Sequence, residues 1–154
     1  MTASTESTTV RLSRTIAAPP ARVYRAWLDP ELLKRWMAPG ARTAPRVEVD
    51  ERPGGRFAVW QADDSGDIGG MEAEILELVP DERLSFRWSF VGPDRAADPD
   101  RETRLTVALR EVDEGTELTL VHERLDGLRD AFPEVADAVS EGWEAVFEKL
   151  DAVV

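Results

Sequence analysis

The feature that most constrains this fold is a series of strand-like segments followed by one long amphipathic segment. In residues 134–154, large apolar side chains recur at every third or fourth position, at Val135, Val139, Trp143, Val146 and Leu150. This spacing predicts a helix about 30 Å long that begins at Pro133. A curved sheet wrapped around this helix is the most economical way to bury both apolar faces.

The segments before this helix alternate apolar and polar residues, as strands do. The clearest of them places four large side chains on one face, Leu84, Phe86, Trp88 and Phe90. The same alternation predicts strands at residues 9–16, 46–51, 56–61, 68–79, 104–112 and 116–125. Because short turns such as Pro53-Gly54-Gly55 separate the strands, we expect an antiparallel sheet with one buried face.

Two short helices are predicted between the first and second strands. Pro19 and Pro20 have the backbone angle that suits the first turn of a helix. Asp29 can cap a second helix that begins at Pro30. The sequence therefore predicts an α+β fold, with residues 9–154 as one domain after a mobile tail at residues 1–8.

Composition excludes several classes of function. The chain has no cysteine, which rules out disulfides and thiolate catalysis. A net charge of −12 opposes binding to nucleic acid. No apolar run approaches the ~18 residues needed to span a membrane, and no export signal is recognisable, so we expect a cytoplasmic protein. A single histidine without an acidic cluster predicts neither a metal site nor a cofactor.

Several short motifs together resemble the START-like, helix-grip superfamily often called SRPBCC. They are Ala18-Pro19-Pro20, Asp29-Pro30-Glu31-Leu32-Leu33, Arg52-Pro53-Gly54-Gly55-Arg56-Phe57, Pro80-Asp81-Glu82-Arg83-Leu84 and Gly142-Trp143. Within the superfamily, the chain is most similar to the domain shared with activators of the heat-shock protein 90 ATPase. This resemblance implies a helix-grip fold with a cavity between the curved sheet and the C-terminal helix.

The sequence departs from the family pattern at two positions. Met37 stands where many relatives carry a second tryptophan, and Val139 stands where many carry a histidine. The absence of that histidine removes a polar group from the helix side of the implied cavity and weakens a catalytic interpretation by analogy.

Aromatic residues are the first candidates for a ligand-binding wall, because small-molecule sites are mostly apolar. The candidate ligand-binding residues are Trp60, Phe86, Trp88, Phe90, His122, Trp143 and Phe147. Plain core packing is the alternative role for all of the aromatic residues.

His122 is the one residue whose side chain could act as a general acid or base near neutral pH. The alternative is a hydrogen-bonded histidine packed among Leu118 and Leu120, on the same strand face. Glu77 could form an acid–base couple with His122 if its side chain faced inward.

Three functions are compatible with these observations. The leading hypothesis is a protein that binds a small apolar or amphipathic molecule in the cavity. The second is a cyclase- or aromatase-like enzyme that uses the same cavity, with His122 moving protons. The third is a protein-interaction module of the co-chaperone type. A homodimer is plausible for this superfamily, but no segment specifies an interface.

Overall fold

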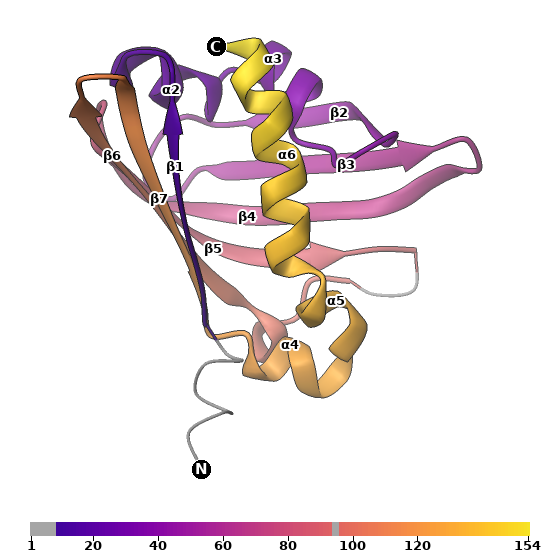
Figure 1. Cartoon of the computed structure of the whole chain (residues 1–154). Coiled ribbons are helices and arrows are strands. Elements are labelled where there is room, and N and C mark those ends of the chain that lie inside the picture. Colours follow the sequence, from indigo (N-terminus) through magenta and orange to yellow (C-terminus); the bar gives the residue numbers. More distant parts are fainter. Residues whose placement is uncertain (1–8, 94–95) are drawn as a thin grey trace.

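Seven antiparallel strands form one curved sheet, and a long helix crosses its concave face (Figure 1). The structure is a computed structural model that describes residues 9–93 and 96–154, so the predicted tail at residues 1–8 lies outside the described residues. The strands are β1 (Thr9–Ile16), β2 (Thr43–Val49), β3 (Arg56–Asp63), β4 (Gly66–Val79), β5 (Arg83–Val91), β6 (Thr103–Val112) and β7 (Gly115–Glu123). Their order, β1-β7-β6-β5-β4-β3-β2, leaves β1 and β2 at the edges.

Two short helices, α2 (Pro20–Ala26) and α3 (Pro30–Trp36), connect β1 to β2 as predicted. Pro20 and Pro30 occupy the first positions of their helices. The side chain of Asp29 caps α3 by accepting a hydrogen bond from the backbone N–H of Glu31 at 2.9 Å. Both helices lie at the same end of the sheet as the C-terminus of the chain (Figure 1).

The region after β7 contains more helices than the single one predicted from Pro133. It forms α4 (Asp126–Ala131), α5 (Pro133–Asp137) and α6 (Val139–Val153), and a short 3₁₀ helix, η1 (Pro99–Arg101), precedes β6. Ala138 separates α5 from α6, and its N–H donates to the carbonyl of Val135, so the last turn of α5 is tightened. Its backbone angles stay in the helical region, which is why apolar periodicity alone did not reveal the break.

Aromatic contacts in the core join the sheet, the two short helices and α6. Trp27 of α2 makes an edge-to-face contact with Trp36 of α3, with ring centroids 4.9 Å apart. Trp143 of α6 lies 5.8 Å from Trp27 and 5.6 Å from Trp88 of β5. Burying each large apolar side chain contributes roughly 1.5–3 kcal/mol, so this cluster is a principal source of stability.

The convex face of the sheet carries ion pairs between neighbouring strands. Arg87 pairs with Glu74 at 3.1 Å, and Arg110 pairs with Glu117 at 2.8 Å. These pairs are exposed, so each contributes about 0–1 kcal/mol. Within the described residues, no helix is both long and apolar enough to cross a bilayer.

Candidate functional site

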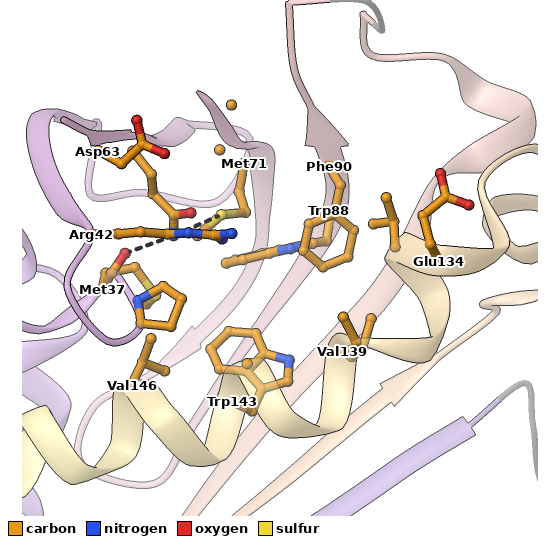
Figure 2. A pocket seen from close by; sticks show the side chains of 17 residues that line it. Met37, Arg42, Asp63, Met71, Trp88, Phe90, Glu134, Val139, Trp143 and Val146 are labelled. Carbon is orange, nitrogen blue, oxygen red and sulfur yellow. Dashed lines mark hydrogen bonds between the residues drawn. The ribbon is translucent and has the colours of Figure 1, made fainter. Parts of the chain in front are cut away.

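A cavity of about 350 Å³ lies between the sheet and the N-terminal half of α6 (Figure 2). Four parts of the chain line it. They are the α3–β2 connection (Met37, Pro39, Arg42), strands β3 and β4 (Gln61, Asp63, Gly69, Gly70, Met71), strand β5 (Trp88, Phe90) and the α5–α6 segment (Glu134, Val135, Ala138, Val139, Gly142, Trp143, Val146). The volume falls within the ~300–1,000 Å³ typical of small-molecule sites.

The floor of the cavity is apolar and buried. Trp88 is 0% exposed, and Met37, Val139 and Trp143 are each at most 5% exposed. Gly142 keeps space open beside them, since a Cβ atom added there would meet no atom within 4 Å. A ligand reaching this floor would contact aromatic and aliphatic surface rather than water.

The rim of the cavity is polar and charged. Arg42, Asp63 and Glu134 are exposed, and they mark the side at which the cavity meets solvent. Asp63 accepts hydrogen bonds from the hydroxyl and the backbone N–H of Ser65, and these bonds hold the pKa of its carboxyl below the usual value. Asp63 is therefore ionised at neutral pH.

Gln61 is the buried polar side chain in the lining. It lies on the same face of β3 as Phe57 and Val59, and its Nε2 donates to the carbonyl of Met37 at 3.0 Å. That carbonyl can only accept, which fixes the orientation of the amide. Gln61 thus joins β3 to the end of α3 through its Nε2. Its Oε1 is the atom of the amide that can accept a hydrogen bond.

Lys149 of α6 anchors the loop that carries Arg42. Its Nζ donates to the carbonyl oxygen of Ala38 and, at 3.3 Å, to that of Arg42. The loop is itself a turn, in which the N–H of Arg42 donates to the carbonyl of Pro39 at 3.1 Å. Gly40 occupies this turn with φ of +58°, a conformation that glycine adopts without strain.

Three of the seven candidate ligand-binding residues lie in the lining, namely Trp88, Phe90 and Trp143. Phe86 and Phe147 are buried in the core beside it: Phe86 packs 5.0 Å from Phe57, and Phe147 packs 6.0 Å from Trp143. Whether the three lining residues bind a ligand stays a prediction.

Trp60 lies on the convex face, outside the cavity. The guanidinium of Arg46 stacks over its ring at 4.1 Å, and that of Arg56 lies 5.7 Å away. Strand alternation explains this placement, because Trp60 lies between Val59 and Gln61, which both face the helix side. The grouping of Trp60 with the cavity aromatics was therefore wrong in position.

His122 is fully buried and lies behind the cavity lining. Its imidazole stacks against Phe90 with ring centroids 5.6 Å apart. Its Nδ1 accepts a hydrogen bond from Nε1 of Trp143 at 3.1 Å, and its Nε2 lies 2.6 Å from Oγ1 of Thr103. Thr103 in turn donates to the carbonyl of Trp88 at 3.1 Å.

These contacts determine the protonation of His122. An indole N–H can only donate, so Nδ1 must be the acceptor and Nε2 must carry the proton in the neutral ring. Burial lowers the pKa of His122 to about 3, so the ring is neutral at pH 7. Both nitrogens are occupied, which leaves neither of them free to exchange a proton with a ligand.

Glu77 does not approach His122. Its carboxylate forms two hydrogen bonds with Arg83, at 2.8 Å and 2.9 Å. A β-bulge between Ile75 and Glu77 causes this orientation, because it interrupts the alternation that would otherwise turn Glu77 to the same face as Ile75. Within the described residues, no group of three or more histidine, cysteine or acidic residues is placed to hold a metal ion.

The lining residues that were not predicted differ in how strongly local patterns indicate their direction. Gln61 occupies an inward position in the alternation of β3, so its burial could have been inferred from Phe57 and Val59. Arg42 lies in a loop, where no periodicity indicates direction. Met37 and Val139, the two positions at which the sequence departs from the family pattern, both line the cavity.

Comparison with solved structures identifies the same fold in several bacterial proteins. Protein CV1439 from Chromobacterium violaceum is 34% identical, with a TM-score of 0.81 and coverage of 96% of this chain and 97% of that one. Protein NE0264 from Nitrosomonas europaea is 28% identical, with a TM-score of 0.78 and coverage of 96% and 94%. Protein Ms6760 from Mycobacterium smegmatis is 26% identical, with a TM-score of 0.81 and coverage of 97% and 91%.

A search of curated proteins finds no match. The family model described as activator of Hsp90 ATPase homolog 1-like protein matches residues 17–154, which include both short helices, β2 to β7 and the whole of α6. The resemblance inferred from the sequence motifs is thereby confirmed, and this chain belongs to the family of proteins like activator of Hsp90 ATPase homolog 1, within the SRPBCC superfamily.

Proposed function

We propose that this chain binds a small apolar or amphipathic molecule in the cavity beneath α6. The observation that carries the proposal is the pairing of a buried aromatic floor, made by Trp88 and Trp143, with an exposed polar rim in a cavity of about 350 Å³. A fold of ligand-binding type, shared with the family, is consistent with this role.

Burial of apolar ligand surface would supply most of the affinity. Covering about 200 Å² at ~25 cal/mol/Å² contributes about 5 kcal/mol, and immobilising the ligand offsets part of it. A ligand held by apolar contact alone is therefore expected to bind with a Kd no lower than about 0.2 mM. Polar groups on the rim would have to supply any higher affinity and the specificity.

The enzymatic alternative has no support in the geometry around His122. A general acid or base must come within hydrogen-bond reach of a substrate atom, directly or through one water. His122 lies behind Phe90, is neutral, and has both nitrogens occupied by Trp143 and Thr103. For the protein-interaction alternative, no described surface feature selects a partner.

A cavity-filling variant tests the proposal. Gly142→Leu would extend a side chain into the open space beside Trp143, while Glu144→Leu places the same side chain at an exposed position of α6. The protein would be screened by thermal shift against apolar and amphipathic compounds, and binding would be quantified by calorimetry. We expect Gly142→Leu to weaken binding by about tenfold or more and Glu144→Leu to leave it unchanged. Equal affinities in the two folded variants would place the binding site elsewhere.

A further inference from the structure

We infer that the molecule bound in this cavity carries a carboxylate, which Arg42 holds at the rim while an apolar body fills the floor. This inference rests on the proposed function and specifies the chemical class of its ligand. It follows from the direction of Arg42, the anchoring of its loop and the placement of the neighbouring acidic groups.

Arg42 is the cationic residue of the lining, and its side chain extends across the cavity. Figure 2 shows it reaching toward Met71 and Trp88, above the ring of Trp143. Among the residues that the structure describes, none forms an ion pair with it. A guanidinium presents a planar fork of donors that matches the two oxygens of a carboxylate, and it accepts no hydrogen bonds. Its natural complement is therefore an anionic oxygen pair.

The backbone of Arg42 is held in place before any ligand arrives. Lys149 donates to its carbonyl oxygen at 3.3 Å and to that of Ala38. The ammonium of Lys149 thus fixes the position from which the Arg42 side chain starts. Anchoring of this kind reduces the ordering cost of binding, because only side-chain torsions remain to be fixed.

The two acidic residues of the rim do not occupy the position of the proposed carboxylate. Figure 2 shows the carboxylates of Asp63 and Glu134 on opposite sides of the cavity, both directed away from Trp143. Asp63 is bonded within its own turn by Ser65. The positive charge of Arg42 also helps to lower the pKa of Asp63, after the bonds from Ser65, but among the described residues the two side chains form no ion pair. The donors of Arg42 are therefore available to a ligand anion, although the net charge of −12 will oppose its approach at low salt.

The indole N–H of Trp88 in the floor does not offer an alternative point of recognition. Nε1 of Trp88 has no hydrogen-bond partner among the described residues, but it is sealed from solvent. A ligand atom could reach it only after neighbouring side chains had moved. Arg42, which lies at the solvent side, is the group that a polar head would meet first.

A pair of probes that differ only in head-group charge tests the inference. Calorimetry would compare 2-naphthylacetate with 2-naphthylacetamide, which has a neutral head of nearly the same size and the same aromatic body. The variants are Arg42→Met, which removes the charge, and Arg42→Lys, which keeps it. Arg46→Met serves as the matched control, because it removes one positive charge from the convex face, where Arg46 stacks on Trp60.

We expect wild-type protein and Arg46→Met to bind the acid about tenfold more tightly than the amide. Arg42→Met should bind both probes equally, with its affinity for the amide unchanged within about twofold, and Arg42→Lys should keep part of the preference. Binding of the amide without preference for the acid in wild type would overturn the inference and leave the proposed function standing. A preference that survives in Arg42→Met would also overturn it. Failure of both probes to bind at millimolar concentration would contradict the inference and the proposed function together.

Discussion

Trp143 donates its indole N–H to Nδ1 of His122 across 3.1 Å, and this bond joins α6 to strand β7 of the sheet. Thr103 completes the arrangement at Nε2 of the ring, 2.6 Å away. Because both partners of His122 are buried and each nitrogen has one assigned role, the network favours a single protonation state. His122 is thus a structural element that positions Trp143 at the floor of the cavity.

Replacing Trp143, the donor in this pair, should lower the free energy of unfolding more than replacing a tryptophan whose indole N–H has no partner among the described residues. Trp143→Phe leaves Nδ1 of His122 unsatisfied, whereas Trp27→Phe removes an Nε1 that has no partner among the described residues. Both changes remove similar volume from the core. We expect Trp143→Phe to lower the free energy of unfolding by about 1–3 kcal/mol more than Trp27→Phe, measured by urea denaturation. Equal losses would show that the hydrogen bond does not stabilise the fold.

Mild acid should destabilise the protein through His122. Its pKa falls from 6.5 in the unfolded chain to about 3 in the folded chain, because burial disfavours the charged ring. The stabilisation is therefore complete above pH 6.5 and is lost as the pH falls toward 3. Between about pH 6.5 and pH 5 the loss of stability comes mainly from His122. Carboxylates with ordinary pKa values of about 4 titrate mainly at lower pH.

The matched measurement is urea denaturation of wild type and His122→Gln at several pH values. We expect wild type to lose about 2 kcal/mol more than the variant between about pH 8 and pH 5. Parallel pH profiles would mean that His122 titrates normally in the folded protein. Since His122 is the only histidine, the NMR shift of its ring proton reports the same titration without ambiguity.

Strand and helix periodicity predicted most of the fold and part of the site. The alternation of β5 placed Trp88 and Phe90 on the buried face, and the helical spacing of α6 placed Trp143 opposite them. The same reasoning could have excluded Trp60, which alternates with Val59 and Gln61. Its inclusion came from residue type rather than from strand direction.

Other features depend on contacts that no local pattern encodes. The bulge in β4 determines which way Glu77 faces, and its position is set by pairing with β5. The direction of Arg42 depends on a loop anchored by Lys149, more than a hundred residues along the chain. The burial of His122 behind Phe90 likewise depends on the register in which β5, β6 and β7 pair.

The two lysines of the chain should differ in their contribution to stability. Lys149→Met removes the donor that joins α6 to the carbonyl oxygens of Ala38 and Arg42, whereas Lys34→Met removes only an exposed pair with Glu31 at 3.3 Å. We expect a loss of about 1–2 kcal/mol for Lys149→Met and less than about 0.5 kcal/mol for Lys34→Met, measured by urea denaturation. Equal effects would indicate that Lys149 does not anchor the loop.

Gly142 should tolerate a methyl group where Gly115 does not. A Cβ atom at Gly142 meets nothing within 4 Å, and alanine favours a helix interior more than glycine does. At Gly115, φ is +135° and a Cβ atom would lie 2.2 Å from the carbonyl oxygen of Ile16. We expect Gly142→Ala to raise the unfolding free energy by about 0.5–1 kcal/mol and Gly115→Ala to lower it. A destabilised Gly142→Ala would mean that the space beside Trp143 is already filled.

The most direct test of ligand binding in the cavity is an NMR titration that follows the indole N–H resonances of the five tryptophans. The probe is 2-naphthylacetate, added to wild-type protein and to Gly142→Leu. We expect the resonances of Trp88 and Trp143 to shift saturably in wild type, that of Trp60 on the convex face to stay fixed, and the response to be much weaker in Gly142→Leu. Shifts centred on Trp60, or an undiminished response of Trp143 in Gly142→Leu, would contradict binding beneath α6.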